Sequence, residues 1–362
     1  MKDLTAENDP LFLKMISWFR FPLIVGVVFI HANLSVININ GENILTGFPQ
    51  WIHYLIHLFS NIFPAICVPL FFFISGYLFF YKSDFNTSEY LKKLKRRIRT
   101  LLIPYILWNI ISYVNFCLKY YFSPIKMADV SLESFLAAFW NFNLVSYTEI
   151  LTTPLNIPLW YVRDLMVVIV LSPLIFYSIK KANLYPVIIL FLCWFFKAWI
   201  EAPGFSITAF FFFTAGAWFS ISKSDVIATF QKTGYIACFA YPVVAAVNVI
   251  LYQESYSGYL YKIAIACGIL SMFYLIPKLL KENKLKINDY LSKTVFFVFA
   301  FHSLIITKLI KGLFILIKPE SPLTALVIYF ICPIITILFS ILIYKYMMRF
   351  FPMFTSILCG NR

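Results

Sequence analysis

Long apolar runs, separated by short polar segments, make up most of this chain. A run of about 20 apolar residues is long enough to cross the hydrocarbon core of a membrane as a helix. The pattern predicts ten such helices, near residues 15–35, 53–81, 100–122, 158–179, 184–201, 204–221, 232–252, 257–277, 291–314 and 323–348. The second run contains Pro64 and Pro69, so we expect this helix to be broken or kinked.

The composition indicates a membrane protein rather than a soluble one. Hydrophobic residues occupy 61% of the 362 positions and charged residues 13%, whereas a soluble domain carries about 25% charged residues. We therefore expect an all-α, polytopic membrane protein in which residues 1–362 form a single transmembrane domain. The net charge of +14 then reports membrane orientation, and we expect no nucleic-acid partner.

Basic segments alternate with segments that are poor in Lys and Arg. Loop 82–99 is the most basic, and the others on the same side hold Lys180, Lys181, Lys223, Lys232, the stretch 278–293, Lys345 and Arg349. The intervening segments 36–52, 202–203 and 253–256 have no Lys or Arg, and the extended external loop 123–157 has only Lys126. The positive-inside rule therefore predicts that both termini and the basic segments are cytoplasmic. The lysines that do not fit are Lys308, Lys311 and Lys318.

Other features of the sequence predict little further chemistry. The seven cysteines are scattered without metal-ligand spacing, so we expect neither disulfides nor a cysteine metal site. His53 and His57 have the spacing of a metal pair, but no third ligand is evident and we expect no metal. The polar first 14 residues argue against a cleavable signal peptide. Within the external loop, residues 132–140 have the pattern of a short interfacial helix.

Arg20 and His31 lie inside the first apolar run. Ionisable groups in hydrocarbon are costly, so they are functional candidates by default. Eleven residues at about 100° each make nearly three turns, which places both side chains on one helix face, roughly 16 Å apart along the axis. The pair then suggests a lined cavity. The alternative is a snorkelling arginine and a hydrogen-bonded core histidine.

Two motifs flank the loop after the second helix. Ser75-Gly76 interrupts a phenylalanine-rich wall and permits close backbone approach, either by another helix or by a ligand. Beyond it, Arg96 and Arg99 are spaced to share one face at the membrane entrance, as in a phosphate clamp. The competing interpretation is that these arginines, with Arg97, bind anionic lipid and fix the topology.

Two later segments also carry polar candidates. Trp160, Arg163 and Asp164 open the fourth helix at its outer end. Arg163 and Asp164 could neutralise one another or nearby partners, or line a polar pocket. Because adjacent residues do not face each other on a helix, we expect each to have a partner elsewhere. His302 lies near the middle of the ninth helix and, with His31, makes two mid-membrane imidazoles. Function and structural pairing remain open for all of these residues.

Taken in order, these segments resemble the acyltransferase-3 family of integral-membrane acyltransferases, and within it the stand-alone sugar O-acetyltransferases such as those acting on enterobacterial common antigen. The resemblance covers nearly the whole chain. The matching features are Arg20 to His31 (R-x10-H), the Ser75-Gly76 wall, the Arg96-Arg97-Ile-Arg99 stretch leading to Pro104, Trp160 with Arg163-Asp164, the Phe210–Gly216 helix and His302.

The resemblance implies a transmembrane O-acyltransferase that uses cytoplasmic acyl-CoA, most simply acetyl-CoA, as donor substrate. It assigns the donor phosphates to Arg96, Arg97 and Arg99, with Ser75 and Gly76 at the donor site. His31 and Arg20 are then the catalytic residues, with His31 as general base or acyl carrier. A surface glycan or lipid-linked sugar is the implied acceptor, bound near Trp160, Arg163, Asp164 and His302.

Two other classes of function remain as alternatives. A transporter or flippase for a glycan or small solute would use the same polar residues to line a path, and it predicts paired broken helices in two related halves. A membrane-embedded sensor has no positive support in the sequence. The composition suggests a bacterial inner or cytoplasmic membrane, lipid contacts around the bundle, and either a monomer or a homodimer.

Overall fold

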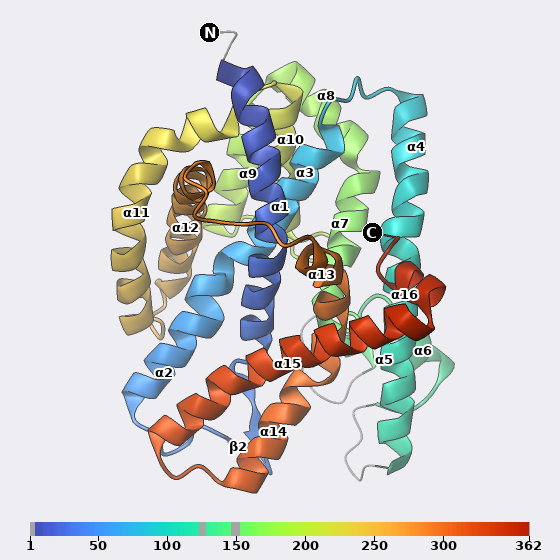
Figure 1. Ribbon diagram of the computed structural model, residues 1–362, viewed down its shortest axis with the longest axis vertical. Coiled ribbons are helices and arrows are strands. Elements are labelled where there is room, and N and C mark those ends of the chain that lie inside the picture. Colours follow the sequence, from blue (N-terminus) through green and yellow to red (C-terminus); the bar gives the residue numbers. More distant parts are fainter. Residues whose placement is uncertain (1–3, 123–127, 146–152, 362) are drawn as a thin grey trace.

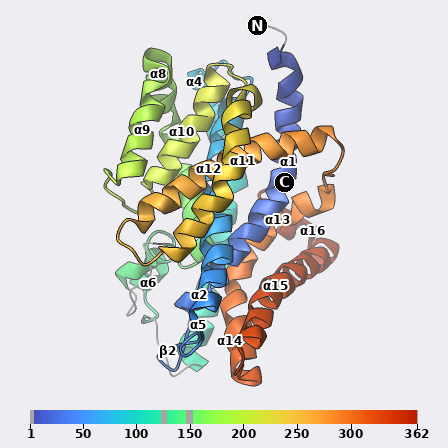
Figure 2. The same cartoon turned by 90° about the vertical axis from the view of Figure 1, so that its left-hand side faces the viewer.

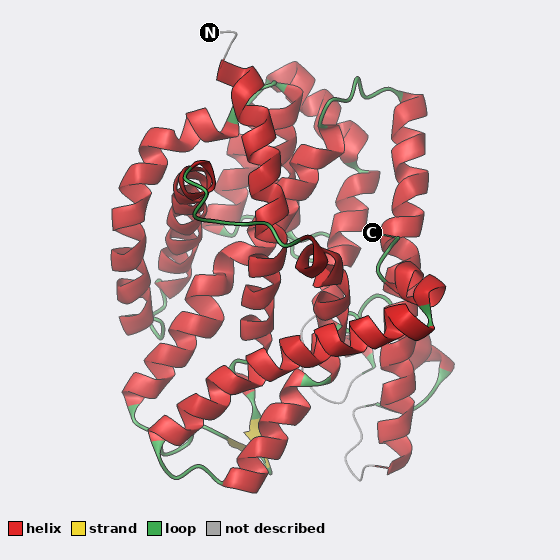
Figure 3. Cartoon of the chain, in the orientation of Figure 1, coloured by secondary structure: helices red, strands yellow, loops and turns green. Residues whose placement is uncertain are grey.

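A computed structural model describes residues 4–122, 128–145 and 153–361. Lys126 and Glu149 of the predicted external loop lie outside the described residues. Helices form most of the described chain (Figure 3), and its two strands make one short antiparallel pair. The elements are, in chain order, α1 (Leu4–His31), η1 (Leu34–Val36), β1 (Asn38–Ile39), β2 (Glu42–Asn43), α2 (Gln50–His57), η2 (Leu58–Ile62), η3 (Phe63–Ile66), α3 (Cys67–Phe80), α4 (Thr87–Arg97), η4 (Ile98–Leu102), α5 (Ile103–Phe122), α6 (Leu132–Ala137), η5 (Phe142–Leu144), η6 (Ile157–Leu159), α7 (Trp160–Val170), α8 (Ser172–Ala182), α9 (Tyr185–Phe196), α10 (Ile207–Ile221), α11 (Val226–Ile250), α12 (Ser257–Lys281), α13 (Asp289–Phe301), η7 (His302–Leu304), α14 (Ile306–Ile317), α15 (Pro322–Phe350) and α16 (Pro352–Leu358).

The helices have the length and apolarity of membrane-spanning segments. Six continuous segments among the described residues qualify, and the number rises to eight if each of two bent helix pairs crosses once. Two shorter apolar helices, α9 and α10, complete the set. These ten segments match the predicted ones in order, which confirms an all-α, polytopic membrane protein. Ten crossings and cytoplasmic termini stay predictions, because α9 and α10 have only 12 and 15 residues.

The second spanning segment changes helix type in its middle. After α2 the chain passes through the π turn η2 and the 3-10 turn η3 before it continues as α3. Pro64 lies in η3 and cannot donate a backbone hydrogen bond, which is a known cause of such irregularity. The predicted break is confirmed. At this break Gly26 of α1 lies so close to Cys67 that a Cβ atom would come within 2.4 Å of its sulfur.

The basic segment that we expected as a loop over 82–99 is helical from Thr87 onward. Asn86 caps α4 by accepting a hydrogen bond from the Glu89 amide at 2.9 Å. Together with the acidic first turn and the basic last turn, this is a typical helix-start pattern. The helix continues through the π turn η4 into α5, and Thr87–Phe122 forms one span of 36 residues. Its basic side chains are therefore held on a helix.

α1 lies at the centre of the molecule and contacts α3, α12, α13 and α15. Figure 1 shows it running along the long axis, with α15 crossing obliquely in front. In the turned view, α8, α9 and α10 lie on one side and α14 and α15 on the other (Figure 2). Because α1 is surrounded in this way, side chains on several of its faces meet other helices. This central position makes it the element on which a site can be assembled.

Candidate active site

Arg20 and His31 both lie on the unbroken helix α1, as the sequence predicts. Their surroundings differ. His31 is the last residue of the helix and is partly buried, whereas the Arg20 side chain is exposed. Within the described part of the chain, neither side chain has a hydrogen bond or an ion pair. A polar side chain in a membrane interior without a partner is free to engage a ligand.

His302 sits where the ninth spanning segment bends. α13 ends at Phe301, η7 contains His302, and α14 leaves at an angle of 48° to the preceding helix. The side chain is fully buried. Its Nδ1 lies 3.0 Å from the Val298 carbonyl oxygen, and because a carbonyl only accepts, Nδ1 is the protonated nitrogen. Nε2 therefore carries the lone pair, and among the described residues this buried atom has no partner.

The bend brings His302 against His31. The two ring centroids lie 5.1 Å apart, with the ring planes tilted by 52°. The sequence indicated two mid-membrane histidines but gave no reason for them to meet. The structure places them in contact, because α13 and η7 pack along α1. A lone pair on one imidazole and an unbonded second imidazole make a site that can accept protons or hydrogen bonds.

Two buried asparagine side chains hold the segment around His302 by hydrogen bonds. Ser303 donates to Oδ1 of Asn156 at 3.1 Å, and the Asn156 side-chain amide donates to the Ala300 carbonyl at 3.1 Å. The backbone N–H of Asn156 donates to Oδ1 of Asn109 at 3.2 Å. Sequence reasoning missed Asn109 and Asn156. The available signal was an amide within, and another beside, an otherwise apolar run, since buried amides require partners.

Arg163 and Asp164 form an ion pair with each other, one of the alternatives left open by the sequence, and each also has a partner elsewhere, as expected. Nε of Arg163 lies 2.9 Å from Oδ1 of Asp164, and the two side chains are only 3% and 1% exposed. The arginine is long enough to curl back along α7. It also donates to the Trp140 carbonyl at 2.6 Å, while the Gly204 amide donates to Asp164 at 3.1 Å. The pair thereby fastens α7 to two connecting segments.

Trp160 and Ser75 lie on the same wall of the bundle. Ser75 and the Tyr161 hydroxyl are within hydrogen-bond distance at 3.2 Å, which joins α3 to α7. Trp160 is partly buried, and its ring lies 6.3 Å from that of Phe72. The polar groups of this wall therefore tie helices together.

Gly76 allows a close crossing of α3 with α10. A Cβ atom at Gly76 would come within 2.0 Å of the Phe213 carbonyl oxygen, and one at Gly216 within 2.0 Å of the Phe73 carbonyl oxygen. Each glycine thus accommodates the backbone of the other helix, as in other tight membrane crossings. Of the two alternatives for the close approach at Gly76, the structure accounts for it by another helix.

Arg96, Arg97 and Arg99 lie where α4 passes into the π turn η4. Arg96 and Arg99 are exposed and, among the described residues, have no hydrogen bond or ion pair, whereas Arg97 is half-buried. Because η4 begins at Ile98, the regular spacing that would align Arg96 with Arg99 is interrupted. Gly360, just after α16, packs against the Thr100 carbonyl of the same turn. The arginines thus project from a braced turn.

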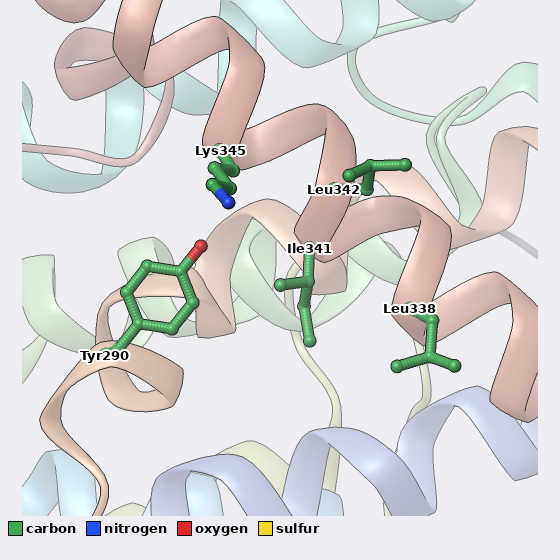
Figure 4. Close-up of a pocket in the computed structure, with 5 residues that line it drawn as sticks. All are labelled: Tyr290, Leu338, Ile341, Leu342 and Lys345. Atoms are coloured by element: carbon green, nitrogen blue, oxygen red, sulfur yellow. The ribbon is translucent and has the colours of Figure 1, made fainter.

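One surface groove is remote from this chemistry. It has a volume of about 460 Å³ and is lined by Tyr290, Leu338, Ile341, Leu342 and Lys345. The Tyr290 hydroxyl and the Lys345 ammonium point toward one another across it, beside an apolar wall (Figure 4). A second, apolar cavity of about 210 Å³ runs along α1 past Trp18, Pro22 and Phe29. At about 100° per residue these positions face away from Arg20 and His31.

His53 and His57 have metal-pair spacing, although the sequence predicts no metal there, and His57 makes other contacts. His57 is within hydrogen-bond distance of Asn248 at 3.2 Å and of Asn61 at 3.1 Å. Its ring stacks on Tyr252 with centroids 4.6 Å apart. In the described residues no group of three or more His, Cys, Asp or Glu side chains could hold a metal ion.

The short helix predicted at 132–140 is present as α6 (Leu132–Ala137).

Comparison with known proteins identifies the family. The acyltransferase-3 model, described as an acyltransferase domain, matches residues 14–345. The succinoglycan biosynthesis protein ExoH of Rhizobium meliloti (strain 1021) is 31% identical over 172 residues, which cover 44% of this chain and 41% of that protein. The match therefore spans about two fifths of the relative's length. No solved structure matches the chain. With the family model matched over most of its length, the chain belongs to the acyltransferase-3 family of membrane transferases.

Proposed function

We propose that this protein transfers an acetyl group from cytoplasmic acyl-CoA to a hydroxyl of an extracytoplasmic glycan or lipid-linked sugar. The observation that carries the proposal is the contact between His31 and His302, where two imidazoles meet and the buried Nε2 of His302 has no partner among the described residues. Family membership and the match to a succinoglycan biosynthesis protein support a polysaccharide-directed acyl transfer. The membrane is the bacterial inner or cytoplasmic membrane.

His31 serves as the general base. The acceptor oxygen attacks the thioester carbonyl carbon while His31 takes the hydroxyl proton, so that a C–O bond forms as the C–S bond breaks. The imidazolium then returns the proton to the departing thiolate, which leaves as the free thiol of CoA. A positioned imidazole contributes about 10²–10⁴-fold to such a step. Direct transfer needs no covalent intermediate on the enzyme.

His302 holds the acceptor hydroxyl beside His31. Its Nδ1 proton is committed to the Val298 carbonyl, which leaves Nε2 to accept the hydrogen bond of the hydroxyl. The buried amides Asn109 and Asn156 keep the bend around Ser303 in place. In this assignment Arg163 and Asp164 position the outer segments next to Trp160. They hold these segments in place and do not bind the acceptor themselves.

The donor enters from the end of the bundle that carries the basic residues. Arg96 and Arg99, exposed on their braced turn, bind the CoA phosphates together with Arg97. Arg20, exposed on α1, faces the pantetheine as the thioester moves toward His31. Ser75 and Gly76 support this route through packing of α3 against α7 and α10.

Acetyl-CoA binding to purified protein in nanodiscs tests the proposal. The Arg96→Gln/Arg99→Gln variant should lose roughly tenfold or more in affinity, as expected for lost charge-assisted hydrogen bonds. His31→Ala should bind the donor normally. Lys92→Gln/Lys95→Gln is the matched control, because these lysines are also exposed on α4. An equal loss of acetyl-CoA affinity in the control would show that the arginines act only through the overall positive charge of the segment.

A transporter is the second candidate, because two apolar helix pairs bend by 58° and 48° as broken spans do. Folded wild-type protein that bound no acyl-CoA would favour transport over transfer.

A further inference from the structure

Three lysines gather at the end of the bundle opposite the N-terminus, on helices that are far apart in sequence. Lys308 and Lys311 lie on α14, and Lys119 lies on the last turn of α5. Both helices extend to this end of the molecule in Figure 1. The Lys308 ammonium donates to Oδ1 of Asn115 on α5 at 3.0 Å, which fixes the two helices side by side. Lys308 and Lys311 are among the lysines that break the positive-inside pattern.

No counter-charge neutralises this cluster among the described residues. Lys119 is subject to the like charge of both Lys308 and Lys311, and none of the three takes part in an ion pair within the described part of the chain. The first acidic residue after Lys119 in the sequence, Asp129, accepts a hydrogen bond from Tyr120 at 3.3 Å. Like charges held together destabilise a fold unless a ligand of opposite charge offsets the repulsion.

The cluster lies directly beyond the histidine pair. On α5, Asn109 bonds to the amide network behind His302, and Asn115 bonds to Lys308. On α5, Asn115, the partner of Lys308, lies about 9 Å further along the helix axis than Asn109, and Lys119 lies about 15 Å further. An acceptor anchored at the lysines can extend its sugar from there toward His31 and His302.

The neighbouring side chains indicate that the anion is attached to a lipid. Leu118 precedes Lys119 and is 55% exposed, and Ile315, one turn after Lys311, is 58% exposed. Exposed apolar residues beside lysines are typical of the boundary between hydrocarbon and headgroups, where lysine side chains reach toward phosphate. A phosphate at this depth belongs to a membrane-anchored molecule.

We propose that Lys119, Lys308 and Lys311 bind the phosphate or pyrophosphate of a lipid-linked saccharide acceptor. The inference rests on the proposed function, which leaves open whether the acceptor is a free glycan or a lipid-linked sugar, and it selects the lipid-linked one. Lysine ammonium groups suit this ligand because they act as point charges toward phosphate oxygens. The site also accounts for lysines on a side of the membrane that otherwise carries few.

Binding of a polyprenyl pyrophosphate to the full-length protein in phosphatidylcholine nanodiscs tests this site without relying on acyl transfer. Wild-type protein should bind it at least tenfold more tightly than the matching polyprenol. The Lys119→Gln/Lys308→Gln/Lys311→Gln variant should lose roughly tenfold or more of that affinity. Lys308→Arg should retain binding, because the charge remains. Acetyl-CoA affinity should be the same in all of these proteins, so failure here is distinguishable from failure of the donor site.

A matched triple variant at the other end of the molecule controls for overall charge. Lys278→Gln/Lys281→Gln/Lys286→Gln removes three exposed lysines from the basic end and should leave polyprenyl pyrophosphate binding unchanged. Phosphatidylglycerol serves as the competing source of phosphate. Competition at equal concentration would overturn the acceptor assignment and leave a general anionic-lipid site. Equal affinity in the wild type and the Lys119/Lys308/Lys311 variant would overturn the site itself.

Discussion

Two buried polar pairs lie in the membrane-spanning part of this protein, and they are built in opposite ways. In the Arg163–Asp164 pair, the charges neutralise each other and further bonds to Trp140 and Gly204 occupy the remaining groups. In the His31–His302 pair, one buried nitrogen has no partner among the described residues, and one imidazole has no hydrogen bond there at all. The first pair is complete without a ligand. The second pair is not.

The difference teaches how to separate structural from functional polar residues in a membrane interior. Leaving a buried polar atom without a partner costs about 1–3 kcal/mol, and a substrate that bonds to Nε2 of His302 would recover that cost. A satisfied ion pair needs no substrate, and its energy goes into holding segments together. Mutations at the two pairs should therefore separate activity from stability.

The largest expected effect is on activity, at His31. His31→Ala should reduce acyl transfer by about 10²–10⁴-fold, the range for loss of a general base. Its thermal unfolding midpoint should stay near that of the wild type, because His31 makes no hydrogen bond within the described residues. Transfer to a model glycan in nanodiscs and a parallel melting curve measure the two quantities. His53→Ala, which changes a histidine near the start of α2, is the control. Normal transfer by His31→Ala would remove the base assignment.

At the Arg163–Asp164 ion pair we expect the opposite result, a loss of stability with little change in activity. Asp164→Ala leaves Arg163 as an uncompensated buried charge, which should lower the free energy of unfolding by about 3–5 kcal/mol. Yield of folded protein and the unfolding midpoint should both fall, while the transfer rate per folded molecule stays near wild type. Asp164→Asn keeps an oxygen for the Gly204 amide, so its unfolding midpoint should lie between those of the wild type and Asp164→Ala. A stable Asp164→Ala protein with no transfer would instead place this pair in the acceptor site.

His302→Phe tests both halves of the comparison in one variant. It should lower transfer by about tenfold to a hundredfold, the value of one hydrogen bond to a reacting hydroxyl, mainly through the acceptor KM. The unfolding free energy should change by less than about 1 kcal/mol, since the substitution removes an unpartnered buried nitrogen. The Val298 carbonyl keeps its bond from the backbone amide of residue 302. A large loss of stability with an unchanged KM would make His302 a packing residue.

The sequence was sufficient for the fold class because membrane helices are specified locally. Each needs only a long enough apolar run, and Pro64 marked the irregular second segment. The helical start of the basic segment at Thr87 was also readable from the Asn86 cap and Glu89, although the charge run obscured it. The short lengths of α9 and α10 were not readable, because both lie in apolar runs that are long enough to predict full spans.

The site was predicted by residue type more than by arrangement. Ionisable groups in apolar runs are rare, so His31, Arg163 and His302 stand out in the sequence. Which of them pair depends on the bend after Phe301 and on the curl of the Arg163 side chain, and neither is a local property. The spacing rule for adjacent helix positions left the contact between Arg163 and Asp164 undecided, because it describes Cβ directions and not the reach of a long side chain.

The smallest expected effect concerns Ser75, which the family resemblance placed at the donor site. Its hydroxyl lies 3.2 Å from that of Tyr161 and joins α3 to α7. Ser75→Ala should therefore lower the free energy of unfolding by about 1 kcal/mol, the net value of one hydrogen bond. Tyr161→Phe removes the same bond from the other side and should have the same effect, and the double variant should cost no more than either one. Acetyl-CoA affinity should remain within about twofold of wild type in all three, because the bond is internal to the protein. An affinity loss in Ser75→Ala alone, without a matching change in Tyr161→Phe, would return Ser75 to the donor site and show that this satisfied hydroxyl serves a ligand after all.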